Sequence, residues 1–95
     1  MWGRGHIIEV DDMHPKVDLM IKAKSYGLFD LCSRARDAGT RWDHIQDSIK
    51  RNNRFRYSTL VKLSHIFEVP LGCWLWTYPE LEYYVEKRRV MGPCL

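Results

Sequence analysis

The sequence lacks the features of a membrane, secreted or metal-binding protein. Its 95 residues contain no apolar run near the roughly 20 residues of a membrane-spanning helix. The three cysteines are an odd number, stand far apart and form no Cys-x-x-Cys pair, so neither a disulfide framework nor a zinc ribbon is indicated. The N-terminus has no apolar stretch typical of a secretory signal. We therefore expect a cytoplasmic protein with no membrane partner.

Signals for catalysis are also scarce. Apart from weak coincidences, the four histidines have no ligand-type partner at a spacing that would build a metal site on one helix face. Asp43 and His44 are adjacent, so their side chains diverge on a helix and form no dyad. No glycine-rich phosphate loop follows a strand pattern. The sequence predicts neither an enzyme nor a metal, a cofactor or a small-molecule substrate.

The hydrophobic content of the chain is sufficient to fill one core. Hydrophobic residues make up 45% of the chain and aromatic residues 13%, which argues against disorder. The length suits one small domain. We expect an all-α domain of five helices behind a short N-terminal arm, residues 1–14, in which residues 6–10 could be extended. Cys32 and Cys73 are expected to be buried as small hydrophobic side chains.

End signals and apolar spacing place the helices. The first is expected to start at Pro15 and to stop at Gly27 as a C-terminal cap. The second, residues 28–38, has an apolar face with the spacing i, i+3, i+4 and i+7, made by Leu28, Leu31, Cys32 and Ala35. Gly39 ends it. Thr40 begins the third helix, which runs to about Arg51 and has one apolar face, made by Trp42, Ile45 and Ile49.

The C-terminal part predicts two further helices. The fourth starts near Ser58 or Thr59 and is stopped by Pro70; its apolar stripe combines Leu60, Val61, Leu63, Ile66 and Phe67. A short apolar connection, residues 72–76, follows. A capping box at residues 77–80 starts the last helix, which runs to about Arg89 and ends in cations that complement its dipole.

Positive charge is concentrated in the middle of the chain. Residues 31–60 carry seven cations and three acids, whereas residues 1–30 carry four and five and residues 61–95 carry four of each. The basic run at residues 50–56 directly follows the third expected helix. A solvated charged face is the simpler explanation, but the local excess is also what a phosphate-binding surface requires.

Ala35, Gly39 and Ile45 then stand at separations typical of two helices joined by a tight turn, followed by Thr59-Leu60-Val61-Lys62-Leu63 with Val69 and Leu71. In these features the chain resembles the lambda-repressor and Cro-like helix-turn-helix family, the XRE type, over about residues 17–76. Arg34, Thr40 and Ser48 depart from the family pattern, although Ile49 can replace Ser48 as an apolar anchor. Trp42 is unusually large for its position.

The resemblance implies a helix-turn-helix domain at residues 15–76 whose third helix enters the major groove of double-stranded DNA. Arg41 and Gln46 have the chemistry to read guanine and adenine. Cations after them would contact phosphates. The full predicted DNA-binding set is Arg41, Asp43, His44, Gln46, Asp47, Lys50, Arg51, Asn53, Arg54 and Arg56. The implied function is sequence-specific transcription regulation, by a repressor of the compact type found in phages and mobile elements.

Self-association is expected at the C-terminal helix, residues 77–95. The chain is most aromatic at residues 74–84, and a small domain has limited interior to bury such residues. The predicted homodimer interface consists of Trp74, Trp76, Leu81, Tyr84 and Val85. Core packing is the other explanation for these side chains.

A function of another class stays open. Asp43 and Asp47 lie on the expected DNA face, where carboxylates repel phosphates. They favour a protein-binding helix-turn-helix scaffold, such as a phage-encoded inhibitor or an antitoxin. The basic run at residues 50–56 favours DNA.

Overall fold

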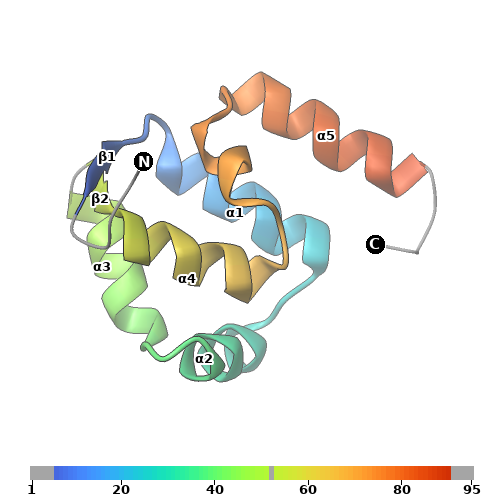
Figure 1. Ribbon diagram of the computed structural model, residues 1–95. Helices are drawn as coiled ribbons and strands as arrows, with labels where there is room; N and C mark the ends of the chain where they lie inside the picture. The colour runs from blue at the N-terminus through green and yellow to red at the C-terminus, as the bar shows by residue number, and fades with distance from the viewer. Residues whose placement is uncertain (1–5, 52, 91–95) are drawn as a thin grey trace.

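A computed structural model describes residues 6–51 and 53–90 of the chain. This part is mostly helical, as predicted, with a small two-stranded sheet in addition. Figure 1 shows the elements, which in chain order are β1 (Ile7–Glu9), α1 (Met13–Lys24), α2 (Leu28–Asp37), α3 (Trp42–Arg51), β2 (Arg54–Arg56), α4 (Tyr57–Phe67), the 3-10 helix η1 (Leu71–Leu75) and α5 (Tyr78–Val90).

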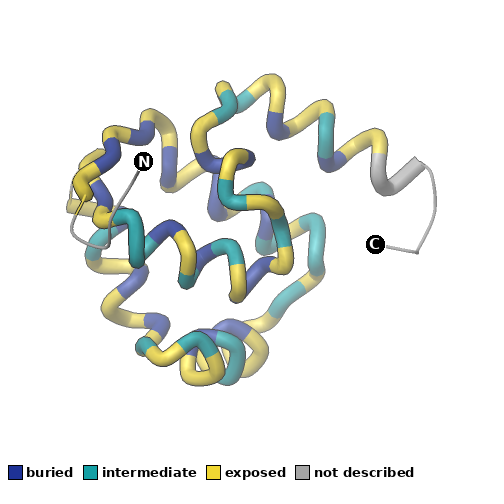
Figure 2. The backbone as a smooth tube through the Cα atoms, viewed as in Figure 1, coloured by how far each residue is buried: buried dark blue, intermediate teal, exposed yellow. Residues whose placement is uncertain are grey.

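The core is built around α4. This helix contacts α1, α2, β2 and η1, and the buried segments of Figure 2 face the space that these elements enclose. The predicted stripe on α4 is confirmed at four of its five positions, whereas Val61 is 43% exposed. The largest side chains that are fully buried are Trp74, Phe67, Met20, Leu60, Leu63 and Ile66. They come from α1, α4 and η1, so the core joins distant parts of the chain.

The described part of the expected N-terminal arm belongs to the folded body. β1 pairs antiparallel with β2, and Ile8 stands opposite Phe55. Both of these side chains are buried, and as directly opposite residues they point to the same face of the sheet. The expectation of an extended segment at residues 6–10 is confirmed, but the segment is a strand of a sheet and not a separate arm. The pairing fixes the residues after α3 against the start of the chain.

The ends of α1 and α2 differ from expectation. α1 begins at Met13, two residues before Pro15, and ends at Lys24. Ser25 caps it in the left-handed conformation, with φ of 58°, so Gly27 is not its C-terminal cap. Gly27 is instead the N-cap of α2, and its N–H donates to the Asp30 carboxylate at 2.9 Å. The chain thus leaves α1 two residues earlier than the glycine suggests.

α2 and α3 are joined by a tight turn. Gly39 has a φ of +83°, a conformation in which side chains are strained. The N–H of Thr40 donates to the Ala35 carbonyl at 2.9 Å, and Ala35 is fully buried. α3 then begins at Trp42, and its predicted apolar face is confirmed, since Trp42, Ile45 and Ile49 are all buried.

Replacing Gly39 by alanine should lower the free energy of unfolding by about 1–2 kcal/mol. A Cβ at Gly39 would meet no atom within 4 Å, so the loss would come from backbone strain alone. Urea unfolding measures it. Gly72→Ala is the matched control, because Gly72 has equally open surroundings without a positive φ. Equal unfolding midpoints for both variants and the parent would contradict the expectation.

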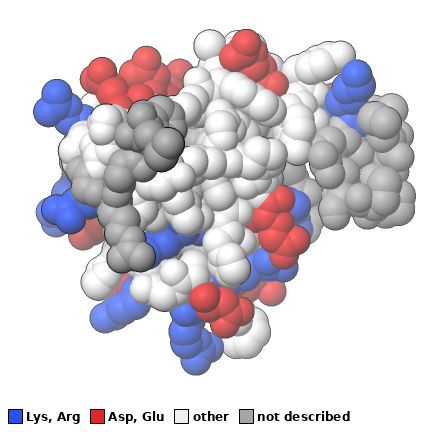
Figure 3. All heavy atoms as spheres, viewed as in Figure 1, with Lys and Arg blue, Asp and Glu red and all other residues white. Residues whose placement is uncertain are grey.

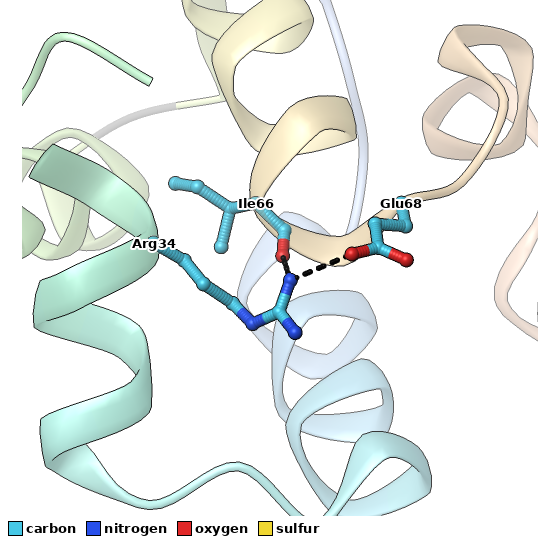
Figure 4. Close-up of polar contacts among 3 residues, drawn as sticks. All are labelled: Arg34, Ile66 and Glu68. Carbon is cyan, nitrogen blue, oxygen red and sulfur yellow. Dashed lines mark hydrogen bonds and ion pairs between the residues drawn. The ribbon is translucent and has the colours of Figure 1, made fainter. Parts of the chain in front are cut away.

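Arg34, which departs from the family pattern, ties α2 to the end of α4. Its guanidinium lies over the Tyr26 ring at 4.4 Å. In Figure 4 the same group reaches the last turn of α4, where Nη1 donates to the Glu68 carboxylate at 2.9 Å and to the Ile66 carbonyl at 3.5 Å. The hydrogen bond from Arg34 lowers the pKa of the Glu68 carboxyl. A half-buried arginine therefore connects α2 to the end of α4 at a position where the family pattern has an apolar side chain.

η1 packs against α4, and α5 packs against α1. The predicted capping box is confirmed: Thr77 N–H donates to the Glu80 carboxylate at 2.8 Å, and Glu80 N–H donates to Thr77 Oγ1 at 3.3 Å. Lys16 of α1 is buried, and its Nζ donates to the Trp74 carbonyl at 2.9 Å. Among the described helices, none is both long and apolar enough to cross a membrane.

Candidate nucleic-acid interface

α3 presents a polar outer face. With three apolar side chains turned inward at helical spacing, the remaining positions apart from half-buried Ser48 face solvent. Six of the predicted DNA-binding residues are exposed there, namely Asp43, His44, Gln46, Asp47, Lys50 and Arg51. In Figure 1 this helix lies at one edge of the molecule, with β2 beside its C-terminal end and α2 beside its N-terminal end. Among the described residues, the outer side chains of α3 are therefore exposed from its first turn to its last.

Arginines neutralise both carboxylates on this face. Arg41 Nη2 lies 3.1 Å from Asp43 Oδ2, and Arg51 Nη2 lies 3.4 Å from Asp47 Oδ2. All four side chains are exposed, so each ion pair contributes at most about 1 kcal/mol and can exchange for another partner. Each of the carboxylates that seemed unfavourable in the sequence is thus paired with an arginine of the chain, and such an exposed pair screens it only in part.

β2 extends the polar face of α3. Arg54 and Arg56 are exposed on either side of buried Phe55 in the alternation of the strand. They border a hollow of about 470 Å³ between α3 and the sheet. Its lining includes five predicted DNA-binding residues, His44, Asp47, Arg51, Arg54 and Arg56. Helix and strand residues from the predicted set therefore meet at one place, and three of the five are arginines.

A second hollow, of about 430 Å³, flanks α3 on the side of α2. Three predicted DNA-binding residues, Arg41, Asp43 and Gln46, line it together with Trp42. Its α2 wall carries Leu28, Cys32 and Arg36. Lys50 borders neither hollow, and the Asn53 amide donates to the Glu9 carboxylate at 3.2 Å. Eight of the ten predicted residues are thus divided between the two flanks of α3.

The lining of the second hollow corrects the predicted apolar face of α2. Leu31 and Ala35 are buried as expected, but Leu28 is 69% exposed and Cys32 is also exposed. Leu28 and Cys32 lie at the edge of the apolar stripe, on the side of the hollow that α2 shares with α3. Cys73, the other cysteine expected inside, is fully buried. The sequence indicated the stripe but not its width.

Several residues of this surface were not in the predicted set. Ile7, Ser48, Phe55 and Thr59 complete the hollow beside the sheet. Ile7 comes from β1, which strand pairing brings to β2 from the start of the chain. Among these residues, the sequence had singled out only Ser48, as a polar residue where the family pattern has an apolar anchor. Cations are spread along the edge of the molecule occupied by α3 and α2 in Figure 3.

Three of the five residues predicted for the dimer interface are buried within the chain itself. Trp74 and Leu81 are fully buried within the chain, and Val85 is 7% exposed, so these side chains are unavailable to a partner. Trp76 and Tyr84 are partly buried and contact each other edge to face, with ring centroids 5.1 Å apart. The aromatic segment mainly packs the domain, which was the other explanation of its composition.

Nothing in the described residues groups three or more His, Cys, Asp or Glu side chains as a metal site would. The chemistry available along α3 and β2 is hydrogen bonding by amide, imidazole, carboxylate and guanidinium groups, and the exposed cations Arg41, Lys50, Arg51, Arg54 and Arg56 outnumber the two exposed carboxylates. Comparison with known proteins found no relative, since no family model matches the chain and neither a curated protein nor a solved structure is significantly similar to it.

Proposed function

We propose that the chain is a sequence-specific regulator that binds double-stranded DNA, with α2 and α3 as a helix-turn-helix of the lambda-repressor type. One observation carries the proposal. Along the exposed face of α3, Arg41 and Gln46 line one flank and the arginines of β2 border the other, so groups suited to bases and groups suited to phosphates stand on either side of one helix. The tight turn at Gly39 and the buried Ala35 beside it support the helix-turn-helix assignment.

Roles within this surface follow from chemistry and position. Arg41 and Gln46, near the start of α3, would donate and accept at base edges in the major groove. Lys50, Arg51, Arg54 and Arg56, at the end of α3 and on β2, would contact phosphates. Phosphate contacts set the affinity and the orientation of a complex, whereas base contacts set its sequence preference. The exposed pair of Arg41 and Asp43 would have to open before Arg41 reaches a base.

The proposal predicts a steep dependence of duplex binding on salt. Lys50→Ala and Arg54→Ala should each reduce the slope of log affinity against log salt by roughly one unit, because each removes one phosphate contact. Titration of a fluorescent duplex across a salt series measures the slope. Lys87→Ala is the control, since Lys87 is an exposed cation on α5, far from α3 in Figure 1. Parental slopes in both test variants would remove the basic run from the interface.

Binding to a protein is the second candidate function. The Asp43 and Asp47 side chains are 62% and 66% exposed on the outer face of α3, where an approaching duplex would bring phosphates near them. An Asp43→Asn, Asp47→Asn double variant separates the two functions. Duplex affinity should rise in this variant if DNA is the ligand, because like-charge repulsion is removed. A chain with no measurable duplex affinity in either form favours a protein ligand.

A further inference from the structure

Arg36 is an exposed cation of α2 that takes part in no ion pair between described residues. Arg34, two residues earlier, extends to the end of α4 and binds the Glu68 carboxylate at 2.9 Å. The carboxylate of the next residue, Asp37, borders a separate hollow together with Arg34 and His65. The positive charge of Arg36 is therefore available to a ligand.

Arg36 lies on the flank of α3 that faces α2. It borders the hollow of about 430 Å³ together with Arg41 and Gln46, two members of the predicted DNA-binding set. Among the described residues that line this hollow, Asp43 is the single carboxylate, so the two arginines leave an excess of one positive charge. α2 contributes no residue to the predicted set, since the sequence assigned DNA contacts only to the third helix and the residues after it.

The arginines of β2 stand on the opposite flank of the same helix. At about 100° per residue, Gln46 lies about 40° and Arg51 about 180° from Trp42 around the axis of α3. Gln46 borders the hollow beside α2, whereas Arg51 borders the hollow beside the sheet, with both arginines of β2. The described lining of the hollow beside the sheet has three arginines and one carboxylate. Positive charge therefore exceeds negative charge on both flanks of α3.

Two positive flanks match the arrangement of phosphates across the major groove of a duplex. An α-helix with its side chains is about 10–12 Å wide, and the major groove of B-DNA is about 12 Å wide. A helix that enters this groove therefore has the phosphates of one strand on each side. A single strand offers one row of phosphates, for which cations on one flank would be enough.

We infer that Arg36 binds a phosphate of one DNA strand while the arginines of β2 bind the backbone of the other, so that α3 lies between the two backbones. The inference rests on the proposed DNA-binding function and adds α2 to it as a second source of phosphate contacts. Arg36 carries no sequence information in this arrangement, because phosphates are the same at every base pair. It fixes the orientation of α3 in the groove.

The salt dependence of binding to a fluorescent duplex of mixed sequence tests the inference. The slope of log affinity against log salt should fall by roughly one unit in Arg36→Ala. It should fall by roughly two units in an Arg36→Ala, Arg54→Ala double variant, because the two side chains contact different phosphates. Arg36→Lys should keep the parental slope, since it keeps the charge. Lys87→Ala, which removes an exposed cation from α5, is the control and should keep it too.

The outcomes separate this inference from the proposed function. A parental slope for Arg36→Ala beside a reduced slope for Arg54→Ala would overturn the inference alone. A double variant with the slope of Arg54→Ala, or a parent that binds duplex no better than a single strand of the same length, would contradict contacts to two strands. A parent that binds neither nucleic acid would refute the proposed function, and the inference with it. Arg36→Ala should unfold at the parental urea midpoint, so a changed slope reflects a lost contact.

Discussion

Trp74→Ala is expected to lower the free energy of unfolding by about 3–5 kcal/mol, the range for removing a large side chain from a core. Trp74 is fully buried, and its ring contacts Phe67 edge to face, with centroids 5.9 Å apart. Its Nε1 donates to Ser64 Oγ at 3.0 Å. The substitution therefore leaves a cavity and a hydroxyl without its donor. For a domain of this size the loss is a large part of the total stability.

Urea unfolding of Trp74→Ala beside Leu75→Ala provides the measurement. Leu75 is the next residue of η1 but is 43% exposed, so its truncation should cost less than about 1 kcal/mol. The comparison also separates the two interpretations of the aromatic segment. If Trp74 belonged to a dimer interface, Trp74→Ala would stay as stable as the parent at low concentration, where the chain is monomeric. A parental midpoint for Trp74→Ala under those conditions would contradict its place in the core.

Local patterns predicted the parts of the fold that depend on neighbouring residues. The spacing of Trp42, Ile45 and Ile49 identified the buried face of α3, because the periodicity of a helix is set within the helix. The capping box that joins Thr77 and Glu80 is equally local, and its hydrogen bonds are present. Such features can be predicted without knowing where distant residues lie.

Contacts between distant residues were beyond these patterns. β1 pairs with β2 across more than 40 residues, and three-residue strands give too little alternation to reveal a partner. The burial of Lys16 depends on the Trp74 carbonyl, 58 residues away. A lysine at an inward position would by itself argue against burial. The sequence could not anticipate a polar group that is buried because a distant carbonyl accepts its hydrogen bond.

For the candidate site, too, local patterns were predictable from the sequence and contacts between distant segments were not. The sequence singled out the polar residues of α3 and the cations after it, which are consecutive along the chain. It did not group them into two flanks, because that depends on where α2 and the sheet lie relative to α3. The exposure of Leu28 and Cys32 was missed for a related reason. The width of an apolar stripe is decided by the helix that packs against it.

Buried Cys73 should make stability decline above pH 9. Burial raises the pKa of its thiol to about 12, from 9.0. Between these values the unfolded chain loses the thiol proton and the folded chain keeps it, so unfolding releases a proton. The stabilisation is complete below pH 9 and is lost as the pH rises toward 12. The loss is at most about 1.4 kcal/mol for each pH unit.

Lys16 acts in the opposite direction over part of this range. Desolvation by burial lowers the pKa of its ammonium from 10.5. The folded chain therefore gives up this proton at a lower pH than the unfolded chain, and stability rises with pH until 10.5 is passed. The two groups are close enough to influence each other, since each shifts the pKa of the other. The pH dependence of the parent alone would combine both effects, so the contribution of the thiol must be obtained as a difference.

Cys73→Ala isolates the thiol, because it removes the group that titrates and keeps Lys16. Urea unfolding at pH 8, 10 and 11 gives the free energy of unfolding for parent and variant. The parent should lose its advantage over Cys73→Ala progressively above pH 9, by up to about 3 kcal/mol between pH 9 and pH 11. Cys32→Ala is the matched control, since Cys32 is exposed in the folded chain, and it should follow the parent at every pH. A constant difference between the parent and Cys73→Ala from pH 8 to 11 would show that the thiol ionises equally in the folded and unfolded chains. Cys73 would then have to be accessible to solvent in the folded chain. The hydrogen bond from Lys16 of α1 to the Trp74 carbonyl of η1 would in that case not keep water from the thiol.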